Sequence, residues 1–440
     1  MIHRLAMDPQ AKKHRIFALY FTLISTTIFL KETTMSIETQ IDLNEFFNVK
    51  SEGKFHILTY KNPNNPCIVY DPGLFHTATC QTALCEIDKS DGQLYYRGIN
   101  ALDKLNDDFL DVAFDIIFST SELHRNHFKQ SVKKHFRLSE EQKILLDAIS
   151  STTHPMDVLS IMTTALSGLE SNYLENPNDP IEKAAFILAS VGITVSYRYS
   201  KLNQIDWIEP QLNRPYAEQV IFQMHGGKDP KKIEKLGKIF NTILILHAEH
   251  GQNCSATTVR CIASAKGTLY TAVAAGMSAF NGDIHGGASQ LVSMMYDEII
   301  EQNLDIDAYI DRKIQNKELL MGFGQRTYNR LGGCWDPRVE KMYEMLIDPE
   351  FDFEEIKKYK EVAVKLIQRV VPDSFYKSKN LTPNPDLFNC IFYKLFGAPK
   401  TMNTTMLAVG RITGWIANFY EHTQDKIPLS RPFDLLKDTI

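Results

Sequence analysis

The chain has 440 residues, of which 44% are hydrophobic and 23% charged, and its formal net charge is -5. This length suggests two or three domain-sized units with ample apolar material for a core. The slightly acidic balance gives no reason to expect nucleic acid or an anionic membrane surface as a partner, so cations that bind an anionic ligand must be placed locally.

The cysteines argue against two common scaffolds. There are seven, at scattered spacings and with no Cys-x-x-Cys pair: Cys67, Cys80, Cys85, Cys254, Cys261, Cys334 and Cys390. A disulfide framework or a structural zinc site is therefore not expected. A reducing compartment fits this usage, and we expect a cytoplasmic protein.

The first 34 residues differ from the rest of the chain. A basic patch, Lys12 to Arg15, precedes an apolar run from Ile16 to Leu30, as in a signal peptide. That run is short for a membrane span, contains four Ser and Thr residues, and is not followed by a small-x-small cleavage site. We therefore expect residues 1–34 to be an extension outside the fold, and we expect the fold to begin at Met35.

A small β segment is predicted between about residues 50 and 100. Two β-favouring runs, Phe55–Tyr60 and Cys67–Tyr70, are separated by Asn-Pro turn residues. Asp91-Gly92 then lies between Cys85–Ile87 and Leu94–Tyr96, which favours a hairpin.

After Ile99 the apolar spacing becomes helical. His154-Pro155 is typical of a helix start, and residues 183–196 predict a buried helix. Apolar residues between Ile233 and His247 recur on one helix face. Residues 257–280 predict one further helix, rich in Ala and Gly and suited to close packing. The sequence thus indicates a mainly α protein with a small N-terminal β segment.

One short stretch, Asn281 to Ala288, interrupts the helices near the middle of the chain. It contains His285, followed directly by Gly286 and Gly287. Glycine here permits backbone angles that other residues avoid and lets a ligand approach the main chain, while histidine offers a donor or acid near neutral pH. The alternative is an ordinary helix C-cap with a histidine beside it.

A second polar cluster, His247-Ala248-Glu249-His250, ends a helix. The two histidines are three residues apart and share a face, as metal ligands do. Glu249 points elsewhere, and no nearby Asp or Cys completes a ligand set. A role as donor to an anion or carbonyl is therefore favoured over metal binding, and a structural helix end is the third possibility.

Acidic and basic residues in apolar surroundings are the remaining candidates. Asp386 follows Asn384-Pro385 and precedes an apolar run, so partial desolvation would raise its pKa towards that of a general base. The alternative is an N-cap. Arg411 lies in an apolar helix, where it needs a carboxylate partner from the protein or from a substrate. Arg338 and Arg431 each lie beside a proline.

From about Phe55 to Arg431 these motifs follow one another as in a known family, and the chain resembles the citrate synthases. The motifs that carry the resemblance are Asp71-Pro72-Gly73, Tyr95-Tyr96-Arg97-Gly98, His154-Pro155-Met156, His247 to Asn253, Asp283 to Ala288, Met321-Gly322-Phe323-Gly324, Asp336-Pro337-Arg338, Asn384-Pro385-Asp386, Gly410 to Trp415 and Ser430-Arg431-Pro432. The early β segment is similar to that of the longer, bacterial-type branch.

The resemblance implies a two-domain helical fold and an assembly. A large domain would comprise residues 35–287 and 398–440, and a small domain residues 288–397, with the site in the cleft between them. A homodimer or a hexamer, as a trimer of dimers, is implied. Acetyl-CoA would be a substrate, with oxaloacetate as its partner, and neither a cofactor nor a metal is implied.

The resemblance also implies roles for named residues. Acetyl-CoA would condense with oxaloacetate to give citrate and CoA, with Asp386 as the base that removes the methyl proton. His285 would donate a hydrogen bond to the thioester oxygen. His250 would contact the second substrate, whose carboxylates would be held by Arg338, Arg411 and Arg431.

One departure falls at the chemistry. The family's Gly-Phe-Gly-His-Arg loop has Gln325 at the histidine position, and residues 331–334 are inserted after it. Glutamine can donate to the keto oxygen but cannot transfer a proton. Losing one such contact typically costs about 100- to 1000-fold in rate. The alternatives are therefore a citrate synthase with weakened carbonyl activation, a 2-methylcitrate or other alkylcitrate synthase, and an impaired pseudoenzyme that binds CoA or dicarboxylates.

Overall fold

The computed structural model describes residues 47–52, 55–60, 70–119 and 121–434. The chain forms two compact units, one made of residues 1–81 with 431–440 and the other of residues 82–430. The predicted extension, residues 1–34, lies outside the described residues. So does most of the predicted strand Cys67–Tyr70.

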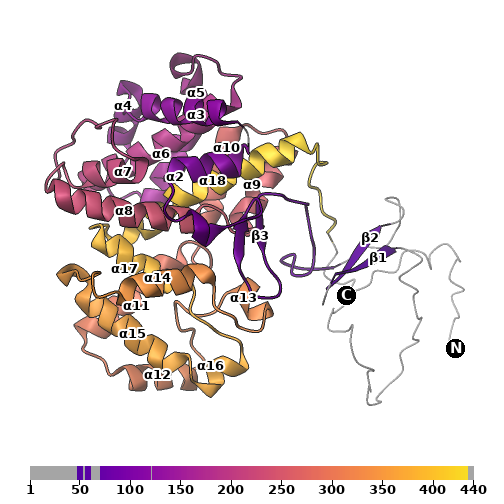
Figure 1. The fold of residues 1–440 in the computed structure, drawn as a ribbon, viewed down its shortest axis with the longest axis vertical. Helices are drawn as coiled ribbons and strands as arrows, with labels where there is room; N and C mark the ends of the chain where they lie inside the picture. The colour runs from indigo at the N-terminus through magenta and orange to yellow at the C-terminus, as the bar shows by residue number, and fades with distance from the viewer. Residues whose placement is uncertain (1–46, 53–54, 61–69, 120, 435–440) are drawn as a thin grey trace, which may run out of the picture. The chain divides into compact units, whose positions relative to one another are not determined.

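The described elements in chain order are β1 (Phe47–Glu52), β2 (Phe55–Tyr60), β3 (Cys85–Ile87), β4 (Leu94–Tyr96), β5 (Ile99–Asn100), η2 (Ala101–Lys104), α2 (Phe109–Ile117), α3 (Glu122–His135), α4 (Glu140–Ala148), α5 (Pro155–Tyr173), α6 (Pro180–Leu202), α7 (Tyr216–Met224), α8 (Pro230–His247), α9 (Cys254–Ser264), α10 (Leu269–Phe280), α11 (Ala288–Glu301), α12 (Ile306–Gln315), α13 (Arg326–Arg330), α14 (Pro337–Ile347), η3 (Glu354–Ile356), α15 (Lys357–Val370), α16 (Ser374–Ser378), α17 (Asp386–Leu395), η4 (Lys400–Met402) and α18 (Asn403–Gln424) (Figure 1). The predicted fold class, mainly α with a small β segment, is confirmed.

The strands form two small antiparallel sheets, one in each unit. β1 pairs with β2, from Phe47 opposite Tyr60 to Glu52 opposite Phe55. In the larger unit β3, β4 and β5 pair in that order. The hairpin predicted around Asp91-Gly92 is confirmed, and Gly92 takes the left-handed conformation (φ +78°) that its turn requires.

The helix predicted over residues 257–280 is wrong in one respect, because the structure divides it into α9 and α10. The chain turns at Lys266 (φ +59°), and the Gly267 N–H donates to the carbonyl of Ile262. Thr268 then caps α10 by accepting from the N–H of Thr271. A C-terminal turn and a new N-cap fit within four residues, and the small-residue composition concealed them.

The helix α18 lies at the centre of the larger unit and packs against α2, α6, α8, α9 and α10 (Figure 1). Two glycines one turn apart, Gly410 and Gly414, allow α18 to approach the end of α8 closely. A Cβ at Gly410 would lie 2.8 Å from the carbonyl oxygen of Leu244, and one at Gly414 would lie 2.0 Å from Oε2 of Glu249. The packing of α18 on α8 therefore requires glycine at both positions.

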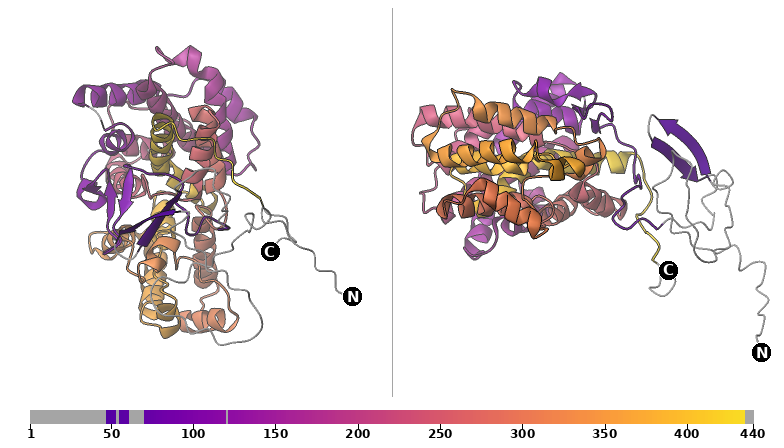
Figure 2. Two further views of the ribbon diagram at one scale, coloured as in Figure 1. Left: turned by 90° about the vertical axis from the view of Figure 1, so that its right-hand side faces the viewer. Right: turned by 90° about the horizontal axis from the view of Figure 1, so that it is seen from below.

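The helices of the larger unit fall into two groups in the views of Figures 1 and 2. One contains α2–α10 with α18, and the other contains α11–α17. Both groups belong to the single compact unit of residues 82–430, so the predicted division into large and small domains stays a prediction.

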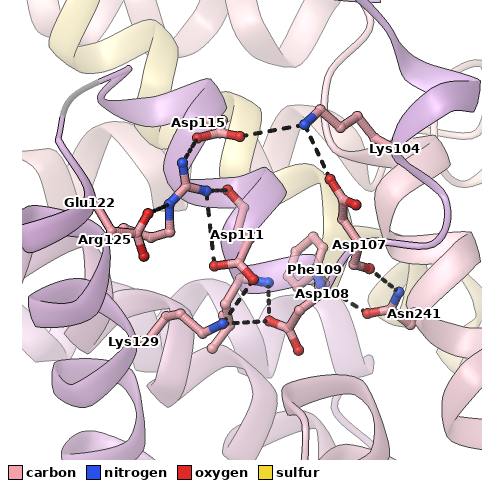
Figure 3. A network of polar contacts seen from close by, with 11 residues as sticks. Lys104, Asp107, Asp108, Phe109, Asp111, Asp115, Glu122, Arg125, Lys129 and Asn241 are labelled. Carbon is pink, nitrogen blue, oxygen red and sulfur yellow. Dashed lines mark hydrogen bonds and ion pairs between the residues drawn. The ribbon is translucent and has the colours of Figure 1, made fainter.

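A polar network fixes the first turn of α2 (Figure 3). Arg125 of α3 pairs with Asp115 at 2.8 Å, and Lys129 pairs with Asp111 at 2.8 Å. Asn241 of α8 accepts from the N–H of Phe109 at 2.9 Å. A cavity of about 870 Å³ borders this network between the segment that precedes α2 and the helices α7 and α8, and its lining includes no residue that the sequence predicts as catalytic or substrate-binding. In the part of the chain that the structure describes, no helix is long and apolar enough to cross a membrane.

Candidate active site

His285 lies in the turn that joins α10 to α11. The following glycines do not use left-handed angles: Gly287 has φ -60°, and Gly286 is not among the described residues with positive φ. The prediction about backbone freedom was therefore wrong here. Glycine is required at both positions for steric reasons. A Cβ at Gly286 would lie 2.7 Å from the Phe280 ring, and one at Gly287 would lie 2.7 Å from the carbonyl oxygen of Asn281.

The imidazole of His285 is held at the first turn of α9. Its Nε2 lies 3.1 Å from Oγ of Ser255 and 3.4 Å from the Ser255 backbone N–H, and Trp415 Nε1 donates to the same Oγ at 3.0 Å. The ring also meets Phe280 edge to face at 4.8 Å. Burial, with a smaller contribution from Arg411, lowers the pKa of His285 to about 4. The ring is therefore neutral at pH 7. Since a backbone N–H can only donate, Nε2 accepts and Nδ1 carries the proton.

Two loops far apart in sequence pair with each other and bring Gln325 and Asp386 to one place. The N–H of Asn384 donates to the carbonyl of Gly322 at 2.9 Å, and its side-chain amide donates to the carbonyl of Gly324 at 3.0 Å. Gly322 and Gly324 have φ of +84° and +85°, which only glycine adopts without strain. The chain therefore makes a tight loop around Phe323.

Asp386 is the first residue of α17 and not its N-cap, so the N-cap alternative is wrong. Its N–H donates to Oδ1 of Asn384 at 3.1 Å, which fixes the start of the helix. Burial raises the pKa of Asp386 to about 7, although Arg338, Asn389 and Arg411 each hold it lower. A carboxyl that titrates near neutral pH is suited to general-base catalysis.

Arg338 is buried and pairs with its own neighbour, Asp336. Nε donates to Oδ1 at 3.0 Å, and Nη2 donates to Oδ2 at 2.5 Å. The Asp336 carboxylate also caps α14 by accepting from the Arg338 backbone N–H at 3.0 Å. No hydrogen bond among the described residues uses Nη1, so this nitrogen could still donate to a further carboxylate.

Arg411 is buried in α18 without a close protein carboxylate. Its Nε donates to the carbonyl of His247 at 2.8 Å, and its guanidinium lies 5.7 Å from the centre of the Phe280 ring. Among the residues that the structure describes, no ion pair within 4 Å includes Arg411. Of the two readings that the sequence left open, the geometry favours a substrate carboxylate as its partner.

The two histidines at the end of α8 have separate surroundings. His247 is fully buried, and its Nε2 meets Oδ1 of Asn389 at 2.8 Å. His250 stacks on Tyr328, with Nε2 3.5 Å from the phenol oxygen, and lies 3.9 Å from the carboxylate of Asp336. Burial, assisted by neighbouring arginines, holds the pKa of both well below the usual range, so both are neutral. Within the described ranges, no group of three or more His, Cys, Asp or Glu is arranged to hold a metal.

Gln325 occupies the residue before α13, and its N–H donates to Oδ1 of Asn329 at 3.2 Å. Its amide nitrogen is buried and has no hydrogen-bond partner in the part of the chain that the structure describes. Rotating the side-chain amide of Gln325 by about 180° would exchange the positions of its nitrogen and its oxygen. The inserted residues after α13 turn through Gly332 and Gly333, both with positive φ.

Arg431, the third predicted arginine, is exposed and belongs to the smaller unit. Six of the predicted site residues lie in the larger unit, namely His250, His285, Gln325, Arg338, Asp386 and Arg411. Three residues that support them were missed by sequence reasoning, namely Ser255, Asn389 and Trp415. The polar residues inside apolar helical segments were the only signal for them.

Comparisons with known proteins show which family the chain is similar to. A family model described as citrate synthase, C-terminal domain, matches residues 73–433. The citrate synthase of Corynebacterium glutamicum is 31% identical over 371 residues, covering 80% of this chain and 82% of that protein. Citrate synthase 1 of Mycobacterium tuberculosis is 29% identical over 385 residues, covering 82% and 86%. The crystal structure of citrate synthase from Thermotoga maritima has a TM-score of 0.71 at 26% identity, covering 83% of this chain and 95% of that one.

Proposed function

The chain belongs to the citrate synthase family, and we propose that it joins the methyl carbon of acetyl-CoA to the keto carbon of oxaloacetate, with hydrolysis releasing citrate and CoA. The observation that carries this proposal is that one buried guanidinium, Arg411, acts on both Asp386, whose pKa is raised to about 7, and the neutral donor His285. A base and a donor at one place are what removal of a proton next to a thioester carbonyl requires.

The first step is enolisation of the thioester. Asp386 takes a methyl proton, and negative charge develops on the thioester oxygen. His285 has its Nε2 occupied at the start of α9, so its Nδ1 proton is the one available to that oxygen. Because the ring is neutral and buried, it steadies the enolate by hydrogen bonding without competing with Asp386 for the proton.

The second substrate is a dianion, and the larger unit offers two buried guanidinium groups for it. Arg411 has no protein ion-pair partner among the described residues, and Arg338 keeps Nη1 apart from Asp336. His250, neutral and stacked on Tyr328, would donate to the same substrate. We assign Arg431 to a third carboxylate contact on the family pattern alone.

The presence of Gln325 where the family has a histidine favours a slower or altered enzyme. At this position an imidazole would donate to the keto oxygen as it becomes an alkoxide, whereas the buried amide of Gln325 can donate but cannot transfer a proton. We therefore propose weakened carbonyl activation, with a loss of about 100-fold or more relative to a histidine. An alkylcitrate synthase, or an impaired protein that binds CoA and dicarboxylates, is the alternative.

The test is release of CoA thiol with oxaloacetate, comparing acetyl-CoA and propionyl-CoA, in the wild type and in Gln325→His. We expect slow release with acetyl-CoA by the wild type and at least a 10-fold increase in kcat for the variant. A preference for propionyl-CoA would identify an alkylcitrate synthase. Absence of release in both proteins, with dicarboxylate binding retained, would identify a pseudoenzyme.

The same family pattern leads us to propose the domain division at residues 287/288 and 397/398, closure of the cleft over the substrates, a cytoplasmic location, and a homodimer or trimer of dimers. Support for the division comes from the two helix groups of Figure 1. Sedimentation velocity of the purified chain tests the assembly, since a monomer at micromolar concentration would contradict it.

A further inference from the structure

A buried carboxylate that the proposed chemistry does not use lies behind the site. Glu249 is 1% exposed and lies between the end of α8 and the middle of α18. Its Oε2 occupies the space that a side chain at Gly414 would fill, since the nearest approach to a Cβ there would be 2.0 Å. Burying a charge at this depth is costly unless both of its oxygens are hydrogen-bonded.

Both oxygens of Glu249 do have donors. Oε1 accepts from the backbone N–H of His250 at 2.8 Å, and Oε2 accepts from the Asn418 amide at 2.9 Å. The orientation of Asn418 is fixed, because its Oδ1 accepts from Arg260 Nε at 2.7 Å and from the Gln252 amide at 2.8 Å. Only its NH₂ group can therefore face Glu249. Two donors point at residue 249, one at each oxygen, an arrangement that suits an ionised carboxylate. Burial raises the pKa of Glu249, and Arg411 and the His250 N–H hold it lower.

The loop that Glu249 begins carries groups for both substrates. His250, which is next in sequence, faces the proposed oxaloacetate position. Asn253, three residues further on, caps α9 by accepting from the N–H of Ala256 at 3.0 Å, and its Oδ1 also accepts from the Ser255 hydroxyl at 2.7 Å. The backbone N–H of Ser255 in turn donates to Nε2 of His285, which faces the proposed thioester.

Glu249 also supports the charge of Arg411. Burial lowers the pKa of this guanidinium, and Glu249 is the strongest influence that raises it. The carboxylate is not within 4 Å of the guanidinium in any ion pair of the described residues, so it stabilises the charge without occupying the hydrogen-bonding edge of Arg411.

We propose that Glu249 is a positioning residue of the active site: its ionised carboxylate, held by Asn418, fixes the loop of residues 249–255 and so places His250 and His285 together. Through this loop one buried anion sets the geometry for both the acceptor ketone and the donor thioester. The expected loss of catalytic rate rests on the proposed function, whereas the expected loosening of the loop of residues 249–255 does not.

The variant Glu249→Gln replaces one of the two accepting oxygens by an NH₂ group, which then meets the donor of either His250 or Asn418. We expect a fall in kcat/KM of about 100-fold for both substrates, as for a displacement of about 1 Å in a reacting group. Adding Asn418→Asp supplies an acceptor where the Asn418 amide stood, while its other oxygen still accepts from Arg260 and Gln252. The double variant should regain at least 10-fold of the loss.

A matched control is available in Glu182. It is also a buried glutamate, 4% exposed, whose two oxygens accept from the backbone N–H groups of Glu175 at 3.0 Å and Asn176 at 2.8 Å. None of its hydrogen-bond or ion-pair partners is a residue of the site. Glu182→Gln should destabilise the fold comparably and leave KM for oxaloacetate unchanged.

Hydrogen–deuterium exchange on the protein without substrates separates this inference from the proposed function. We expect Glu249→Gln to accelerate exchange at residues 250–256, the double variant to restore protection, and Glu182→Gln to leave it unchanged. Unaltered exchange in Glu249→Gln, or no recovery in the double variant, would overturn the inference, whatever the thiol assay shows. If Glu249→Gln alone fails to fold, the double variant must fold and show the protected loop.

Discussion

Replacing Asp386 by asparagine should remove activity and yet stabilise the folded chain, with a gain that depends on pH. Burial raises the pKa of Asp386 from its ordinary 3.8 to about 7. Between these two values the unfolded chain loses the proton while the folded chain keeps it. Stability from this group is therefore fully present below pH 3.8 and is lost as pH rises to about 7.

The magnitude follows from the size of the shift. The difference between 3.8 and about 7 corresponds to about 4 kcal/mol at about 1.4 kcal/mol per pKa unit. This is an upper value, since the unfolded chain is not fully solvated. From pH 5.5 to pH 8, Asp386→Asn should become more stable relative to the wild type by about 2 kcal/mol.

Urea unfolding at pH 5.5 and pH 8, at one protein concentration, measures this difference. The control is Asp373→Asn, because Arg369 lowers the pKa of Asp373 and its carboxyl is therefore ionised in both states across this range. For the control, the difference from wild type should not change with pH. A pH-independent difference for Asp386→Asn as well would refute the reasoning that burial raises the pKa of this carboxyl.

Two other predictions concern the arginine and the glycines around the site. Arg411→Gln should raise KM for oxaloacetate at least 10-fold. It should also move the acidic limb of the pH–rate profile to higher pH, because Arg411 lowers the pKa of Asp386. An acidic limb that does not move in steady-state kinetics would contradict this. Gly414→Ala should destabilise the fold by at least about 2 kcal/mol, because the new Cβ would meet Glu249 at 2.0 Å. Gly168→Ala should instead stabilise the fold by about 1 kcal/mol, because Gly168 lies in α5 and its new Cβ would have no heavy atom within 4 Å. Thermal unfolding shows whether each variant is less or more stable than the wild type.

Features with a local cause could be predicted from the sequence. The hairpin at Asp91-Gly92 and the helix start at Pro155 follow from turn and cap chemistry, which a few adjacent residues determine. The break between α9 and α10 could not be seen, because a run of small residues with helical periodicity hides a four-residue turn. Apolar spacing alone does not locate caps.

Features of the site with a distant cause could be predicted only in part. The environment of Asp386 indicated a raised pKa, but the arginines that hold it lower come from α14 and α18. Ser255 and Trp415, which hold His285, are unremarkable in sequence and meet only when α9 packs on α18. The glycines after His285 were predicted for backbone freedom, whereas their neighbours in space require them for close packing.

We propose that proton removal by Asp386 is intact while carbonyl activation at Gln325 is weak. Acetyl-CoA deuterated at the methyl group, incubated with oxaloacetate and followed by mass spectrometry, tests it most directly. With the wild type, unreacted acetyl-CoA should lose deuterium faster than citrate forms. With Gln325→His, citrate should form faster than acetyl-CoA loses deuterium. With Asp386→Asn, neither process should occur. Deuterium loss that persists in Asp386→Asn, or its absence in the wild type, would contradict the account.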